Sequence, residues 1–126
     1  MQKLPAVLLL GLALPALAAT PTGRVPYQGQ PGQLPLEVAI HLTRNQLGSQ
    51  GKFDYRTLKI TQTSQPGVFD QAEIVIIQDG LQDGNIKASR QRLQLSRNQH
   101  TWTVHSITED FTCRRGRKGW GTTPCP

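Results

Sequence analysis

The sequence predicts an α+β fold in which one N-terminal helix packs on a curved, four-stranded antiparallel sheet. Three observations lead to this fold class. Apolar residues recur at helical spacing after Pro35, their period changes to about 2 after Gly51, and clusters of turn-forming residues then separate four strand-like segments. The chain has 126 residues, a length that favours a single domain.

The predicted helix begins at Pro35, because proline suits the first helical position, where its missing N–H would be unpaired anyway. Glu37 lies in the first turn, where its charge favours the helix dipole. Gly48 is a natural end of the helix. The apolar stripe expected to face the sheet is formed by Leu36, Ala39, Ile40, Thr43 and Leu47.

The first two predicted strands differ in their expected burial. Leu58 and Ile60 alternate with polar neighbours, which indicates a half-buried strand. Residues 64–67, Ser-Gln-Pro-Gly, form a turn. Residues 74–77 are four consecutive β-branched residues, so we expect a central strand that is covered at least in part on both faces.

The last two strands, residues 85–96 and 101–113, are joined by a hairpin turn over residues 97–100. In the first of them the apolar residues change parity, which predicts a β-bulge near Arg90 to Arg92. In the second, Trp102 and Val104 point inward and the later apolar residues have the opposite parity.

The second parity change predicts a bulge near His105 or Ser106. Two bulges on adjacent strands would bend the sheet strongly, so that the helix lies in its concave face. The expected outline is cystatin-like, a comparison of pattern that does not fix function.

Residues 1–18 have the pattern of a secretory signal peptide. Lys3 precedes an apolar run that ends in Ala16-Leu17-Ala18, a small-x-small cleavage pattern. The run is shorter than the roughly 20 residues of a membrane span, and no later segment is apolar enough to be one. We therefore expect a secreted or periplasmic protein with a flexible, Pro/Gly-rich leader over residues 19–34 and a single domain over residues 35–126.

The two cysteines, Cys113 and Cys125, form an even and local pair, which in an exported protein predicts a disulfide. The ring would hold about 13 residues and stabilise the fold by about 3 kcal/mol on the chain-entropy model. A metal pair is the alternative, but two thiols without a neighbouring histidine are too few ligands for zinc.

The net charge of +6 is concentrated near the C-terminus. Residues 113–126 contain four cations and no acid, whereas residues 19–112 contain 9 basic and 8 acidic residues. Such a loop can attract polyanions, acidic surfaces or anionic lipids, and a tryptophan can stack on a base or sugar. The candidate binding residues are Arg114, Arg115, Arg117, Lys118 and Trp120.

A purely structural role is the alternative for this loop. Trp120 would then pack back on the sheet with an arginine on its face. The cations would be solvated or would pair with Glu109 and Asp110.

Three segments resemble a family of small secreted bacterial proteins that is common in cyanobacteria and has a C-terminal Cys-bounded Gly-Arg loop. They are residues 80–86 (Gly-Leu-Gln-Asp-Gly-Asn-Ile), Trp102-x-Val104, and residues 113–117 (Cys-Arg-Arg-Gly-Arg) followed by Trp120 and Cys125. Family members usually carry C-x-x-G-R-G-H, whereas Lys118-Gly119 stands here where Gly-His is expected. The resemblance implies export, the disulfide and a bacterial envelope setting, and no established activity.

The sequence thus favours a non-enzymatic extracytoplasmic binding or accessory domain, with no cofactor or metal motif. The first alternative is a binder of polyanions, whether nucleic acid, acidic polysaccharide or anionic lipid. The second is a small hydrolase using His105, with Ser106, Glu109 and Asp110 close in sequence. His105 and Ser106 would diverge on a regular strand unless a bulge intervenes. The third is an edge-strand pairing module.

Overall fold

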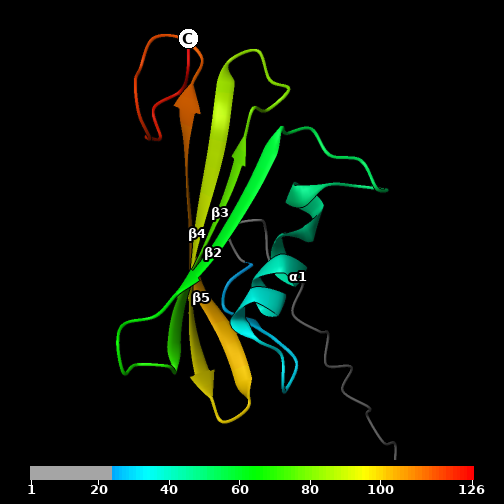
Figure 1. The fold of residues 1–126 in the computed structure, drawn as a ribbon, viewed down its shortest axis with the longest axis vertical. Coiled ribbons are helices and arrows are strands. Elements are labelled where there is room, and N and C mark those ends of the chain that lie inside the picture. Colours follow the sequence, from blue (N-terminus) through cyan, green and yellow to red (C-terminus); the bar gives the residue numbers. More distant parts are fainter. Residues whose placement is uncertain (1–23) are drawn as a thin grey trace, which may run out of the picture.

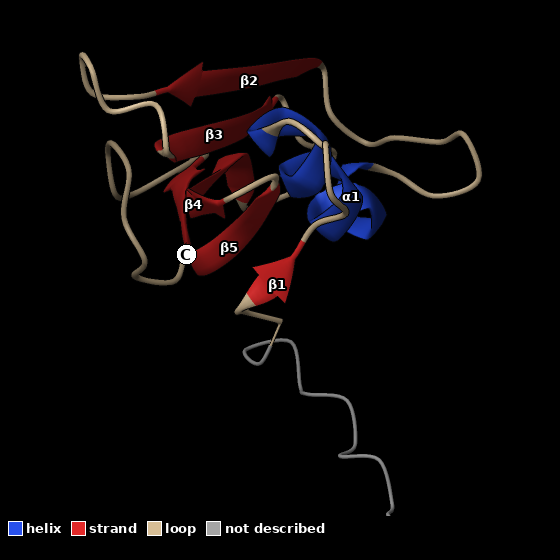
Figure 2. Cartoon of the chain, turned by 90° about the horizontal axis from the view of Figure 1, so that it is seen from below, coloured by secondary structure: helices blue, strands red, loops and turns tan. Residues whose placement is uncertain are grey.

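The computed structural model describes residues 24–126 as one helix on one face of a five-stranded antiparallel sheet. The strands follow the order β1-β5-β4-β3-β2, with α1 against one face of β3, β4 and β5 (Figure 2). The predicted α+β class is confirmed, and the sheet has one strand more than predicted. The elements are β1 Tyr27–Gln28, α1 Pro35–Leu47, β2 Thr57–Thr63, β3 Gln71–Asp79, β4 Ile86–Asn98 and β5 Thr101–Cys113.

The additional strand, β1, lies in the segment expected to be a flexible leader. Tyr27 pairs with Val104 of β5, and the Gly29 N–H donates a hydrogen bond of 2.9 Å to the carbonyl of Trp102. The Tyr27 ring also stacks on His41 of α1. Residues 27 and 28 are therefore part of the sheet, although the sequence analysis placed the start of the domain at residue 35, because composition does not reveal pairing of the backbone with a distant strand. The predictions for residues 1–18 and 19–23 lie outside the described residues.

Helix α1 has the predicted ends, and its buried face matches the predicted stripe except at Leu36 and Val38. The Glu37 carboxylate accepts a hydrogen bond of 3.0 Å from the N–H of Leu34 at the first turn, and Gly48 follows the last helical residue. Leu36, expected in the apolar stripe, is exposed, whereas Val38 is fully buried. Thr43 is buried in this face, and its hydroxyl donates a hydrogen bond of 2.8 Å to the carbonyl of Ala39. The buried helix residues are Pro35, Val38, Ala39 and Thr43.

The core lies between α1 and the concave face of the sheet. Strands β3, β4 and β5 each place alternate side chains on this face, as the period of a pleated strand requires. Trp102 and Val104 point inward as predicted, and the run 74–77 lies in a strand flanked by two others. The buried sheet residues of this core are Ala72, Ile74, Ile76, Leu93, Leu95, Trp102 and Val104.

One predicted bulge is confirmed and the other is displaced. In β5 the register passes from Gln94↔Ser106 to Leu95↔Val104, so His105 is the extra residue, as expected. In β4 the register shift falls at Lys87 rather than at Arg90 to Arg92. Ala88 is buried on the face opposite the helix and Leu93 on the helix face. Between Ala88 and Leu93 the covered face of β4 changes, so the apolar parity changes there although the register is continuous.

The chain after β5 turns back at one end of the sheet as a disulfide-closed loop, on the side away from α1 (Figures 1 and 2). We call residues 113–126 the C-terminal loop. The Cys113–Cys125 disulfide closes it with a Cα–Cα distance of 5.4 Å, as predicted. Phe111 and Gly121 exchange two backbone hydrogen bonds of 3.0 Å, so the loop returns along the outer edge of β5. Within residues 24–126, no helix has the length and apolarity that crossing a bilayer would require.

Candidate binding site at the C-terminal loop

A hollow of about 370 Å³ opens where the C-terminal loop meets the ends of β4 and β5. Its lining includes five basic residues and no acidic residue. We call this feature the basic hollow. Four of the five predicted binding residues line it, and Trp120 follows the lining segment in the chain. The basic residues of the lining are Lys87, Arg114, Arg115, Arg117 and Lys118.

Arg117 is turned into the C-terminal loop and holds it together. Its guanidinium donates to the carbonyls of Gly119 and Thr123 at 2.9 Å each. Longer bonds of 3.2 and 3.4 Å reach Phe111 and Gly121. The guanidinium also lies 5.2 Å from the centroid of the Phe111 ring. Arg117 therefore positions the loop backbone, and its partners are neutral groups that leave its charge uncompensated.

Arg114 joins the C-terminal loop to the connection between β3 and β4. Its Nε donates to the carbonyl of Asp83 at 2.6 Å, and a second nitrogen donates to the carbonyl of Leu81. The carboxylate of Asp83 caps this connection by accepting from the backbone N–H groups of Asn85 and Ile86 at 2.7 and 2.8 Å. These backbone bonds lower the pKa of Asp83, burial opposes the shift, and the charge of Arg114 adds to the lowering.

Three cations of the hollow remain for a ligand. Arg115 and Lys118 are exposed, and neither forms an ion pair or side-chain hydrogen bond within residues 24–126. Lys87, the third, is the bulged residue of β4, and a bulge re-aims a side chain relative to a regular strand. Sequence analysis missed Lys87, because a single lysine in a strand carries no signal until the register is known.

Trp120 packs against the sheet through Arg90 of β4. The Arg90 guanidinium lies 4.3 Å from the centroid of the indole ring, and 37% of Trp120 stays exposed. Arg90 is itself fixed by a bidentate pair with Asp110, with bonds of 2.9 and 2.5 Å. This is the packing considered as the structural alternative for Trp120, with an arginine from the sheet rather than from the loop.

The Arg90–Asp110 pair also shifts the pKa values of both its members. The hydrogen bonds from Arg90 lower the pKa of the Asp110 carboxyl, and the same bonds raise the pKa of Arg90. Asp110 therefore neutralises a sheet arginine instead of a loop cation. The positive charge of the basic hollow is left without a carboxylate partner in the lining.

His105 lies outside this site. Its Nε2 contacts the hydroxyl of Ser96 on the neighbouring strand, not that of Ser106. The imidazole is exposed on the sheet, and among the described residues no carboxylate is hydrogen-bonded to it. A hydrolytic centre needs a third group that orients the base, and within residues 24–126 no such group is hydrogen-bonded to His105.

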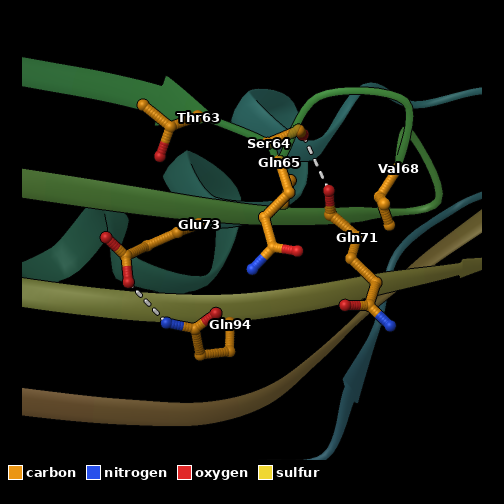
Figure 3. A pocket seen from close by; sticks show the side chains of 8 residues that line it. Thr63, Ser64, Gln65, Val68, Gln71, Glu73 and Gln94 are labelled. Atoms are coloured by element: carbon orange, nitrogen blue, oxygen red, sulfur yellow. Dashed lines mark hydrogen bonds between the residues drawn. The ribbon is translucent and has the colours of Figure 1, made fainter.

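A second hollow, of about 400 Å³, lies beside the turn between β2 and β3 (Figure 3). Its lining is mostly neutral and polar. Glu73, its one acidic residue, accepts a hydrogen bond of 2.6 Å from Gln94, and Ser64 donates to the carbonyl of Gln71 at 2.7 Å. Because Glu73 and Ser64 are already hydrogen-bonded and no charge accumulates there, the basic hollow is the better candidate for a ligand site.

The fold and the site together define a small α+β domain that carries a disulfide-closed basic loop. Within residues 24–126, no group of three or more His, Cys, Asp and Glu residues is arranged to hold a metal ion. No family model matches the chain, and neither curated proteins nor solved structures give a match. The resemblance to secreted bacterial proteins therefore stays a prediction, and the function has to be argued from the site.

Proposed function

We propose that the protein is a non-enzymatic binding module that holds a polyanion in the basic hollow. The observation that carries the proposal is the lining, which combines five basic residues with no acid. A concave surface lined by one sign of charge focuses the electrostatic potential and raises the local concentration of the opposite charge. An anionic polymer is the ligand class that such a surface attracts.

The hydrogen bonds of the hollow strengthen this argument. Arg114 and Arg117 donate to backbone carbonyls, which orient the guanidinium groups without cancelling their charge. Arg115, Lys118 and Lys87 remain available for direct contact with anionic groups, and an arginine can contact a phosphate or carboxylate with two parallel bonds. The hollow thus combines a fixed positive field with side chains that can still reach a ligand.

The loop that carries these cations is held in place before any ligand binds. The disulfide, the Phe111–Gly121 bridge and the four carbonyls bound by Arg117 all restrain its backbone. Preorganisation reduces the ordering entropy that binding would otherwise cost. A module of this kind can bind without a large conformational change.

We further propose that the module acts outside the cytoplasm. The signal-like residues 1–18 and the Cys113–Cys125 bond support this setting, because disulfides persist in oxidising compartments. Mass spectrometry of the protein from its native host tests the proposal. We expect a mature N-terminus at Ala19 and no free thiol, and an intact Met1 with two thiols would contradict it.

Binding to heparin and to long-chain polyphosphate, two polyanions without bases, tests the binding proposal. Three phosphate contacts predict that log K falls with log salt with a slope of roughly 2 to 3. The double variant R115E/K118E should abolish binding. R44E/K52E, which makes the same change of charge at a hollow beside the end of α1, should bind nearly as the parent does.

The outcome that contradicts the proposal is equally specific. An affinity that does not change with salt would contradict it, and so would a failure to bind either polyanion at low salt. An equal loss of binding in both double variants would contradict it as well. The last result would mean that net charge alone, and not the basic hollow, governs the interaction.

A further inference from the structure

The exposed side of Trp120 is a rigid aromatic platform beside the basic hollow. The Arg90 guanidinium lies over one face of the indole, 4.3 Å from the ring centroid, and 37% of Trp120 is exposed. Arg90 cannot easily leave, because Asp110 holds it with two hydrogen bonds. A ring supported in this way offers a flat surface at little entropic cost.

The cation behind the ring also affects what will stack in front of it. A guanidinium over an indole is attracted to the negative charge of the π-face, and it draws electron density toward its own side. The outward face is then a poorer partner for the partly positive C–H groups of a sugar. An electron-rich purine, which has a π-face of its own, is a better partner in an offset stack.

Both elements that build this platform also carry free cations a few residues away in the sequence. Lys118 and Arg115 precede Trp120 on the C-terminal loop, and Lys87 precedes Arg90 on β4. All three line the basic hollow. A stacking surface beside a positively charged track is the arrangement by which proteins bind single-stranded nucleic acids.

We propose that the polyanion is a single-stranded nucleic acid, with one base stacked on Trp120 and the flanking phosphates bound by Arg115, Lys118 and Lys87. The inference rests on the proposed function and adds the class of polymer. It requires an unpaired strand, because bases in a duplex expose only their edges in the grooves.

The test compares two strands of equal length and charge with the full mature chain. One is an oligodeoxyadenylate, and the other carries abasic sites in place of the bases. Fluorescence anisotropy at constant salt should show about tenfold tighter binding of the base-bearing strand, in the range of one base stacked on one aromatic ring. The variant W120L should remove this difference and leave the affinity for the abasic strand unchanged.

F69L is the matched control, because Phe69 is an exposed aromatic residue of the β2–β3 turn, outside the basic hollow. It should bind both strands as the parent does. Equal affinity of the parent for the two strands, or an equal loss for both in W120L, would overturn the inference while the binding of heparin and polyphosphate still upheld the proposed function. Failure to bind any polyanion would overturn both.

Discussion

Two arginines of the C-terminal loop show how differently the same residue type is used. Arg117 is folded inward, where it binds four backbone carbonyls, whereas Arg115 is exposed and free of partners within residues 24–126. The fork of a guanidinium lets one side chain satisfy several acceptors at once. Arg117 is therefore expected to stabilise the loop, and Arg115 to contribute to binding.

Replacing Arg117 by alanine should destabilise the protein by about 1 to 3 kcal/mol, because partly buried carbonyls lose a charged donor. Urea denaturation measures the change in the free energy of unfolding. R117K should not restore the parent stability, because an ammonium cannot reproduce the fork. K118A is the control and should stay within about 0.5 kcal/mol of the parent. Equal effects of R117A and K118A would contradict this role for Arg117.

Asp110 makes stability depend on pH in acid. Its folded pKa is lowered by the bonds from Arg90, so its contribution is complete above the unfolded pKa of about 3.9 and is lost as the pH falls through the folded pKa. At pH 7, D110N should be less stable than the parent by roughly 1 kcal/mol.

Thermal unfolding at pH 7 and pH 2 checks this dependence. The difference between D110N and the parent should shrink at pH 2, because the contribution of the charged carboxyl is lost as the pH falls from the unfolded pKa through the folded pKa. E109Q changes the adjacent carboxyl, which forms no ion pair within residues 24–126, and should show no such convergence. A difference that persisted unchanged at pH 2 would show that the loss is not due to ionisation of Asp110.

For single residues, the sequence indicated which loop residues belong to the site but not which residues of the sheet contact them. The four cations and Trp120 could be selected because they share one short segment without acids. Arg90 and Lys87 could not, because their proximity depends on which residue of β4 faces which residue of β5. The pairing of Asp110 with Arg90 is a cross-strand contact of the same kind.

Elements defined by local signals were predicted well, and those defined by tertiary pairing were not. The ends of α1 follow from Pro35 and Gly48, and the hairpin between β4 and β5 follows from its polar turn. Strand β1 has only two residues and no apolar alternation, so it exists only because β5 offers an edge. The position of the β4 bulge likewise depends on which face of the strand is covered.

Gly29 fixes β1 against the helix and allows a sharp test of this contact. A Cβ at this position would lie 2.4 Å from a methyl carbon of Val38, a stiff and fully buried side chain. G29A should therefore cost about 1 to 3 kcal/mol through overpacking. G84A is the control, because nothing lies within 4 Å of a Cβ there.

The double variant G29A/V38A, together with the two single variants, forms a double-mutant cycle in which the free energy of unfolding is measured. Removing the Val38 methyls should relieve the clash, so the double variant should be more stable than the sum of the two single effects predicts. Strict additivity would indicate that residues 24–34 do not pack on α1 in solution.

On the scale of the whole molecule, the core and the site are separate. The core lies between α1 and the concave face, whereas the basic hollow lies on the C-terminal loop at one end of the sheet. Only the loop is closed by the disulfide. Reduction should therefore affect the site far more than the sheet.

Reducing the Cys113–Cys125 bond should lower stability by about 3 kcal/mol at most, since it opens a short ring. Far-ultraviolet circular dichroism should keep the sheet signal, while affinity for heparin should fall because the cations are no longer preorganised. C113S/C125S should behave like the reduced protein. Full binding after reduction would show that Arg117 and the backbone bridge suffice to hold the loop.

The outer edge of β5 is shared by the two ends of the described chain. Strand β1 pairs with Thr103 and Val104 near its start, and Gly121 bridges Phe111 near its end. At the opposite side of the sheet, β2 is the terminal strand, and its outer edge has no partner among the described residues. Two copies could pair edge to edge through β2 around a twofold axis. Such a dimer would use the β2 edge of both copies. Strand addition through β2 would then end in a closed pair, because each copy has used its β2 edge.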